Sequence, residues 1–302
     1  MKVVSLYRFL DLQDPDAFRD ELKALCVSEQ LLGTMLVATE GFNGTLAGSE
    51  ASIRTVMAWI QKRLGIDEEL DARWTDADEA PFRKMRVKVK NEIVTLGRPD
   101  LLPHRRTGEH VDAQRWNELI KDPDVIVVDT RNHYEIEVGT FPGALDPGND
   151  SFREFPQFAK ELAEESRDRP LAMFCTGGIR CEKATALMLE LGFDEVYHLQ
   201  GGILNYLQEV DEDNNQWRGE CFVFDQRVAV DRDLSEGGYV QCHACRRPLS
   251  SDDLNSPDYR EGVSCPQCVN ESDEDRRARL EERRKQVALA AERGEKHIGP
   301  RS

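Results

Sequence analysis

The chain has 302 residues, a length that predicts two domains, or three if one is small. Hydrophobic residues make up 39% of it, and no apolar run approaches the roughly 18 residues of a membrane-spanning helix, which argues against a membrane-embedded protein. The 40 Lys and Arg residues against 57 Asp and Glu residues give a net charge of −17, so the surface as a whole does not attract nucleic acid or anionic lipid. Any such partner must bind a local patch.

The pattern of residues 1–97 predicts a ferredoxin-like or acylphosphatase-like α+β domain. Strands and helices are expected at 3–10, 14–30, 33–48, 50–64 and 83–96. Segment 33–48 is predicted to be two short strands with a turn at Gly41–Gly44. Segment 83–96 is predicted to be a strand pair that follows an acidic loop ending at Pro81. This order, roughly βαββαβ, is typical of a split-βαβ sandwich. Cys26 falls on the apolar face of the first helix, and we interpret it as a core residue.

A linker of turn residues at 98–110 leads to a second domain at 111–210. Helices and apolar strands alternate there, with helices expected at 112–121, 151–166 and 181–192 and strands at 125–128, 171–174 and 195–199. This alternation predicts a parallel α/β sheet. Residues 211–274 are polar, turn-rich and contain four paired cysteines, which predicts a small metal-binding module. Residues 275–302 predict a charged helical tail.

The strongest catalytic signal is the segment LAMFCTGGIRCEKA, in which an apolar strand ends at Cys175 and a helix follows near Cys181. Ligands of open α/β sheets bind at this edge. Gly177 and Gly178 allow backbone N–H groups to point inward, and together with the helix N-terminus and Arg180 they predict an anion cradle around the sulfur. Such a cradle lowers the pKa of the thiol and also fits an anionic persulfide.

The length of this loop helps to choose its chemistry. Four residues from Thr176 to Ile179 separate Cys175 from Arg180, whereas the loops of tyrosine phosphatases enclose five and are wide enough for a phosphate. Sulfur chemistry is therefore favoured over phosphoryl transfer. Cys181 is a candidate resolving thiol for a persulfide or sulfenate on Cys175, the alternative being an ordinary cysteine at a helix start.

The loop, the upstream segment VVDTRNHYEIEVGTFPGAL and the downstream segment YHLQGGILNY together resemble the rhodanese domain. The resemblance implies a parallel sheet with the cysteine loop at its edge. It also implies that Asp129 and Arg131 lie near that loop and mainly organise the fold.

Cysteine spacing in the C-terminal part predicts a metal site. The N-terminus lacks the basic and apolar leader of an exported protein, so we expect a cytoplasmic location, where cysteines serve metal binding or thiol chemistry more often than disulfides. Two CxxC pairs fit a structural zinc ion with four thiolates: Cys242, Cys245, Cys265 and Cys268. A redox dithiol pair, or His243 in place of one cysteine, is the alternative. Cys221 has no partner at ligand spacing and reads as a strand residue.

Two segments oppose the acidic total. Residues 83–106 carry eight Lys and Arg against two acids, and residues 276–301 carry nine against four. A polyanion therefore has to dock on these stretches, although exposed basic residues on a strand or an ion-paired helix also serve ordinary solvation. The candidate RNA-binding residues are Arg83, Lys84, Arg86, Lys88, Lys90, Arg105 and Arg106.

Five segments occur in one order along the chain: EGFNGTLAG, RVKVKNEIVTLG, CTGGIRCEKA, GECFVFDQRVAV and CHAC…CPQC. In this order they resemble the bacterial oxygen-dependent tRNA uridine(34) hydroxylase family. The resemblance implies hydroxylation of the wobble uridine to 5-hydroxyuridine, with the family's active-site cysteine, a persulfide intermediate, at Cys175. It also implies molecular oxygen as co-substrate, the tRNA anticodon stem-loop as partner in place of DNA or a membrane, and an electron donor that the sequence does not name.

The residues themselves do not indicate how oxygen is activated. There is no GxGxxG fingerprint, and the six histidines show no evident two-histidine, one-carboxylate pattern, so neither flavin, haem nor non-haem iron is expected. One hypothesis is that Cys175, as thiolate or persulfide, attacks C6 of the uracil and activates C5. The alternatives are a rhodanese-type sulfurtransferase that passes the persulfide to cyanide, a thiol or a tRNA-thiolation partner, and a non-enzymatic adaptor.

Overall fold

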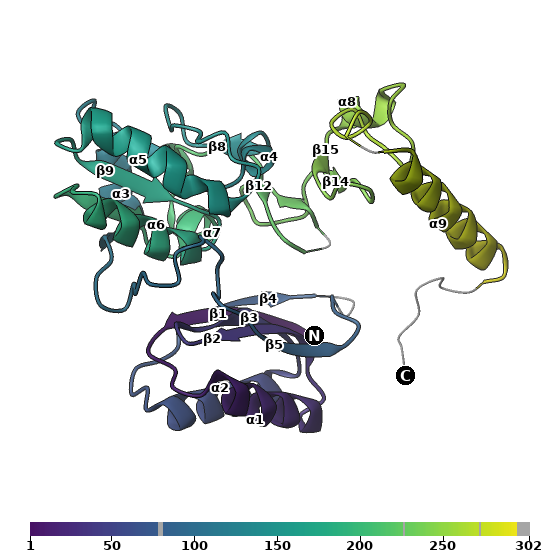
Figure 1. The fold of residues 1–302 in the computed structure, drawn as a ribbon, viewed down its shortest axis with the longest axis horizontal. Helices are drawn as coiled ribbons and strands as arrows, with labels where there is room; N and C mark the ends of the chain where they lie inside the picture. The colour runs from purple at the N-terminus through teal and green to yellow at the C-terminus, as the bar shows by residue number, and fades with distance from the viewer. Residues whose placement is uncertain (78–80, 226, 272, 295–302) are drawn as a thin grey trace. The chain divides into compact units, whose positions relative to one another are not determined.

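The computed structural model describes residues 1–77, 81–225, 227–271 and 273–294. They form two compact units, shown as a ribbon in Figure 1. The first unit contains Met1–Asn132 and Gly143–Tyr206, and the second contains His133–Pro142 and the chain from Leu207 onward. Among the described residues, no helix is long and apolar enough to cross a membrane.

The first unit begins with a five-stranded sheet covered by two helices on one face (Figure 1). Its elements are β1 (Lys2–Phe9), α1 (Pro15–Ser28), β2 (Leu32–Ala38), β3 (Gly41–Gly48), α2 (Glu50–Leu64), β4 (Ala72–Asp76) and β5 (Met85–Val89). The strand order is β4-β1-β3-β2-β5, in which β5 runs parallel to β2 and the other neighbours are antiparallel. The predicted α+β sandwich is confirmed.

Both helices of this sheet begin at side-chain caps and bury an apolar face. Asp14 accepts the backbone N–H of Ala17 at 2.9 Å, and Ser49 caps α2 in the same way. Phe18, Leu22 and Cys26 lie four residues apart on α1 and are buried in the core. Cys26 is therefore a core residue, as expected.

Two local expectations for this sheet were wrong. The turn between β2 and β3 lies at residues 39–40, because Ala38 pairs with Gly41 and the glycines fall inside β3. A Cβ on Gly44 would lie 2.2 Å from the Thr34 carbonyl oxygen, so this glycine serves a close strand approach rather than a turn. Residues 83–96 form one strand and not two. After β5, the carboxylate of Glu92 accepts the backbone N–H groups that a second strand would pair with a neighbour. The remaining strand, β4, lies within the expected acidic loop.

The rest of the first unit is built on a parallel sheet. Its strands are β6 (Glu109–Val111), β7 (Ile126–Asp129), β9 (Leu171–Phe174) and β10 (Val196–Leu199), in the order β6-β10-β9-β7. The helices are α3 (Ala113–Leu119), η1 (Phe152–Glu154), α5 (Phe155–Ser166), α6 (Ile179–Glu190) and α7 (Gly202–Glu209). The predicted alternation is confirmed, while β6 begins within the expected linker and α6 begins two residues before Cys181.

The second unit consists of short elements and one long helix. They are α4 (His133–Ile136), β8 (Gly139–Thr140), η2 (Glu212–Asn214), β11 (Arg218–Gly219), β12 (Cys221–Phe222), β13 (Ala229–Val230), β14 (Val240–Gln241), β15 (Pro248–Leu249), α8 (Ser251–Asn255) and α9 (Glu274–Glu292). The strands form three two-stranded ladders. Cys221 is a buried strand residue and α9 is a charged helix, both as expected. Part of the basic segment 276–301, at 295–301, lies outside the described residues.

Candidate active site at the cysteine loop

The Cys175 loop connects the carboxyl end of β9 to the N-terminus of α6. The backbone N–H of Gly178 donates to the Cys175 sulfur at 3.1 Å. Gly178 has a φ of 95°, a conformation that favours glycine, and it directs this N–H inward. Arg180 is buried and donates to the Thr176 hydroxyl at 3.3 Å, so its charge lies within the loop. The predicted anion cradle is thus present around the sulfur.

The electrostatics of this cradle favour a thiolate. Burial raises the pKa of the Cys175 thiol, but a hydrogen bond from the Cys181 thiol, the charge of Arg180 and backbone N–H groups outweigh it and lower the pKa to about 6. The same burial and the neighbouring Cys175 sulfur raise the pKa of Cys181. A thiolate at Cys175 beside a neutral thiol at Cys181 is therefore the stable arrangement of this pair near neutral pH.

Cys181 lies in the first turn of α6, and its thiol interacts with the Cys175 sulfur. It is fully buried, hydrogen-bonds with the Cys175 sulfur, and lies 3.6 Å from the Thr130 hydroxyl. Thr130 is held in turn by the Phe174 carbonyl at 2.9 Å. The loop therefore contains two adjacent sulfurs in different protonation states.

Backbone N–H groups at the N-terminus of α7 hydrogen-bond to the loop, a contact that local sequence patterns did not indicate. The backbone N–H of Ile203 donates to the Cys175 carbonyl at 2.9 Å, and that of Leu204 donates to Thr176 at 3.2 Å. A Cβ on Gly202 would lie 2.4 Å from the Cys175 carbonyl oxygen and 2.8 Å from the N atoms of Gly177 and Gly178. Only glycine allows this contact between the two backbones.

Side chains from the N-terminal sheet also reach the loop. The hydroxyl of Tyr7, on β1, donates to Glu182 at 3.3 Å and lies close to Gly178. Burial and the charges of Glu182 and Cys175 raise the pKa of Tyr7 well above its ordinary value, so it remains a phenol. Arg73, on β4, donates to the Gly201 carbonyl at 2.6 Å. Cys175 itself is only 1% exposed.

Asp129 and Arg131 form a buried ion pair at the end of β7, with Arg131 Nη2 2.6 Å from Asp129 Oδ2. Arg131 also lies over the ring of Phe174, the residue before Cys175, at 5.9 Å. The pair therefore contacts the strand that carries the nucleophile. Among the described hydrogen bonds, none joins either residue to the Cys175 sulfur.

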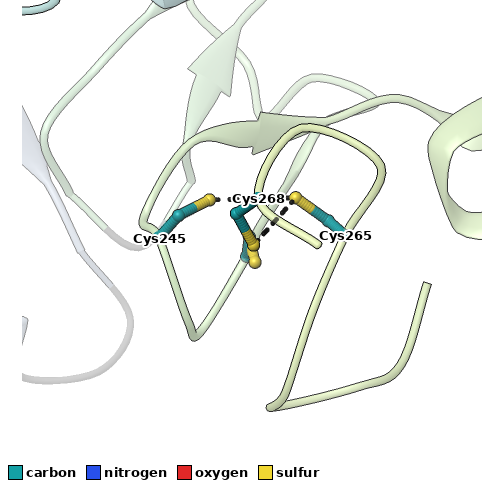
Figure 2. Close-up of side chains that lie close together, drawn as sticks. Cys245, Cys265 and Cys268 are labelled. Carbon is teal, nitrogen blue, oxygen red and sulfur yellow. Dashed lines mark hydrogen bonds between the residues drawn. The ribbon is translucent and has the colours of Figure 1, made fainter. Parts of the chain in front are cut away.

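The four cysteines of the C-terminal module converge as their spacing predicts, and Figure 2 shows three of them. The sulfurs of Cys242, Cys245, Cys265 and Cys268 all lie within 4.8 Å of one another. Cys245 and Cys265 are 3.8 Å apart, and Cys265 and Cys268 are 3.6 Å apart. Sulfurs about 2.3 Å from a tetrahedral zinc ion lie about 3.8 Å apart, so this cluster fits such a metal. His243 is exposed and is not part of the cluster.

A second group of metal-ligating side chains, which the sequence did not indicate, is formed by His110, Glu182 and His198. His110 Nε2 lies 2.9 Å from Glu182 Oε1, and this contact raises the pKa of His110. Burial lowers the pKa of His198 to about 4. The position of both histidines near the ends of apolar strands is a signal that the sequence contains. That the two histidines meet depends on strand order, which the sequence does not indicate.

The candidate RNA-binding residues fall in two places. Arg83, Lys84, Arg86, Lys88 and Lys90 are exposed on or beside β5, which is an edge strand. Arg105 and Arg106 are exposed before β6, and Arg105 pairs with Asp11 at 3.2 Å. Lysines on an edge strand also prevent unwanted strand pairing, so exposure by itself does not assign them a role.

Family models and one relative define the class of protein. Residues 1–93 match the UPF0176 acylphosphatase like domain, and residues 112–209 match the Rhodanese-like domain. The chain is thus a rhodanese-domain protein with an acylphosphatase-like N-terminal domain. A protein of Teredinibacter turnerae named tRNA uridine(34) hydroxylase is 48% identical over 300 residues, which are 99% of this chain and 93% of the relative. The chain belongs to the tRNA uridine(34) hydroxylase family.

Two solved structures are each similar to one part of the chain. The rhodanese-like domain of an Anabaena protein has a TM-score of 0.31 at 16% identity and covers 37% of this chain and 80% of its own. An acylphosphatase from Coxiella burnetii has a TM-score of 0.22 at 15% identity and covers 29% of this chain and 90% of its own.

Proposed function

We propose that this protein is a tRNA-modifying enzyme that hydroxylates the wobble uridine 34 to 5-hydroxyuridine, with molecular oxygen as co-substrate. The observation that carries the proposal is the 48% identity to a tRNA uridine(34) hydroxylase over nearly the whole of both chains. The cysteine loop supports it, because the Cys175 pKa of about 6 provides a thiolate at neutral pH. We propose that the enzyme works in the cytoplasm together with its tRNA substrate.

In the proposed mechanism, the sulfur of Cys175, as thiolate or persulfide, forms a bond to C6 of the flipped-out uracil. The π electrons of the C5–C6 bond move towards O4, which leaves an enolate that is electron-rich at C5. C5 then bonds to one atom of O2. A two-electron donor and protons from solvent reduce the other atom to water, and loss of the C5 proton and of the sulfur restores the double bond.

The remaining loop residues have supporting roles in this proposal. The Gly178 N–H and Arg180 stabilise the sulfur anion before attack and after departure, and Thr176, Gly177 and Ile179 shape the loop. Cys181 is the resolving thiol when Cys175 carries a persulfide or sulfenate. Because Cys175 is 1% exposed, the base reaches the sulfur only after the side chains that cover it move.

We assign roles to the four-cysteine cluster and to the basic residues from the chemistry of their side chains. Zinc is the metal that four thiolates at this spacing favour, and four protein ligands leave no position for substrate, so its role is structural. The exposed basic residues on and beside β5, with Arg105 and Arg106, dock the anticodon stem-loop. The electron donor is a separate partner.

The test is nucleoside mass spectrometry of tRNA from cells that lack the gene and are complemented with wild type, Cys175→Ser or Cys26→Ser. Cys26→Ser is the matched control, because Cys26 is also buried but lies in the core of the N-terminal sheet. We expect wild type and Cys26→Ser to restore 5-hydroxyuridine-type nucleosides and Cys175→Ser to restore none. Full hydroxylation by Cys175→Ser contradicts the mechanism.

The loop also supports a second function, rhodanese-type sulfur transfer, because its four-residue span fits a persulfide. Thiocyanate production from thiosulfate and cyanide that is lost in Cys175→Ser, together with normal tRNA hydroxylation in that variant, would favour the sulfurtransferase over the hydroxylase.

A further inference from the structure

We propose that His110, Glu182 and His198 bind a divalent first-row transition-metal ion beside the cysteine loop. The ligand atoms of these three residues lie within 4.8 Å of one another, which is close enough for one ion to be reached by small side-chain rotations. The proposal does not rest on the hydroxylase reaction, because it follows from the donor atoms alone.

The sheet topology explains why the two histidines meet. β6 and β10 are parallel neighbours, and His110 lies directly opposite His198 in their register. Side chains at paired positions leave the same face of a sheet, and the two rings are 4.0 Å apart between centroids. The helix α6 packs against β10 and contributes Glu182 from its first turn. Three separate elements thus deliver two imidazoles and one carboxylate to one place.

The distances fit metal coordination. Two donors at right angles, each about 2.1 Å from an ion, lie about 3.0 Å apart. His110 Nε2 and Glu182 Oε1 are 2.9 Å apart. Two imidazoles and a carboxylate suit first-row ions such as Fe²⁺, and three protein ligands leave coordination positions open for water or another small molecule.

An independent observation concerns His198, which is 1% exposed and has no hydrogen-bond partner for either ring nitrogen among the described residues. Buried polar nitrogens normally have partners, so an orphaned imidazole indicates a missing ligand. The backbone of Gly108 lies beside the ring, although not in hydrogen-bond geometry. Metal-bound histidines commonly use a backbone carbonyl for the nitrogen that does not bind the ion.

The surroundings of the cluster support the same conclusion. Tyr7 donates to the Glu182 oxygen that faces His110, and such a second hydrogen bond orients a ligating carboxylate. The side chain of His110 is 44% exposed, so an ion has access from that side, whereas Glu182 is 12% exposed. Tyr7 lies within range of the charges of Glu182, Cys175 and Cys181, so the cluster and the two sulfurs share this neighbour.

The experiment uses the full-length protein, first given one equivalent of Zn²⁺, which the four thiolates of the cysteine cluster bind in preference, and then loaded with Fe²⁺ without oxygen. After desalting, elemental mass spectrometry measures both metals per chain. We expect about one iron per chain in wild type in addition to the zinc, and loss of the iron in Glu182→Gln and His110→Ala. Tyr7→Phe is expected to weaken iron binding about tenfold.

The control is His133→Ala, which removes a half-exposed histidine outside the cluster and should retain both metals. Circular dichroism checks that each variant is folded, and Glu182→Gln keeps the size of the side chain. Absence of iron in folded wild type, or equal iron in wild type and both cluster variants, overturns the proposal. Because no tRNA is needed, failure here is distinct from failure of the proposed function.

Discussion

The ammonium group of Lys183 lies 2.8 Å from the carboxylate of Glu40, and both side chains are almost completely buried. Lys183 belongs to α6, the helix that begins at the cysteine loop, whereas Glu40 lies in the turn between β2 and β3. The Glu92 carboxylate is 2.6 Å from the same nitrogen. One cation between two carboxylates therefore links the N-terminal sheet to the helix that carries Arg180, Cys181 and Glu182.

Removal of this cation should destabilise the first unit. Lys183→Met leaves two buried carboxylates without their counter-ion, and we expect a loss of about 3–5 kcal/mol in the free energy of unfolding. Urea denaturation measures it, with Lys121→Met, at an exposed position, as the control. Addition of Glu40→Gln and Glu92→Gln should recover part of the loss. A change below about 1 kcal/mol, the usual range of an exposed ion pair, would show that the triad contributes little.

The Cys175 thiolate should form at an unusually low pH. With a pKa of about 6, the sulfur is protonated below this pH and ionised above it. The ultraviolet thiolate absorbance of wild type minus that of Cys175→Ser should therefore rise with a midpoint near pH 6. Arg180→Gln should move this midpoint upward, because it removes a positive charge that favours the thiolate. A midpoint near the ordinary value of 9 in wild type would contradict the cradle.

Gly202 should be essential to the loop for a reason other than its backbone angle. Gly202→Ala and Gly192→Ala both place a side chain at positive φ, which costs roughly 1 kcal/mol. Only Gly202→Ala brings a Cβ to 2.4 Å from the Cys175 carbonyl, since no atom lies within 4 Å at Gly192. We expect Gly202→Ala to displace the loop and abolish tRNA hydroxylation, and Gly192→Ala to remain active. Equal activity of the two variants would exclude this role.

Removal of metal from the four-cysteine cluster should unfold its module. The local core consists mainly of the cysteines with Leu249, and the strands β14 and β15 have two residues each, so the metal replaces a larger core. Treatment with a chelator should expose the chain after residue 211 to protease, while the parallel sheet stays resistant. Cleavage of both regions at the same rate would argue against a local structural metal.

The basic residues of β5 should contribute to tRNA affinity through charge. Lys88→Glu and Lys90→Glu are expected to weaken binding at low salt, and each lost phosphate contact should reduce the slope of log affinity against log salt by about 1. Lys121→Glu, another exposed lysine, is the control for the change in net charge. Filter binding at several salt concentrations measures these slopes. Unchanged slopes would indicate that these lysines only protect the sheet edge.

The sequence by itself determined the features whose residues are neighbours in the chain. The Cys175 loop, from strand end to helix start, lies within one short segment, and each CxxC pair brings two sulfurs together through a local turn. The alternation of strands and helices likewise predicted the parallel sheet, because hydrophobic period is a local property. Even so, the turn at residues 39–40 and the strand β4 were missed, since glycines and acidic residues there serve the sheet rather than a loop.

Only the tertiary structure decided which distant residues meet. Lys183 and Glu40 are separated by 143 positions, and Tyr7 and Glu182 by 175. His110 meets His198 because β6 lies beside β10 in the parallel sheet. Strand order results from how whole layers pack and bury their apolar faces, and no local pattern encodes it. For that reason the sequence identified the nucleophile, while its surroundings, the buried ion triad and the histidine cluster required the fold.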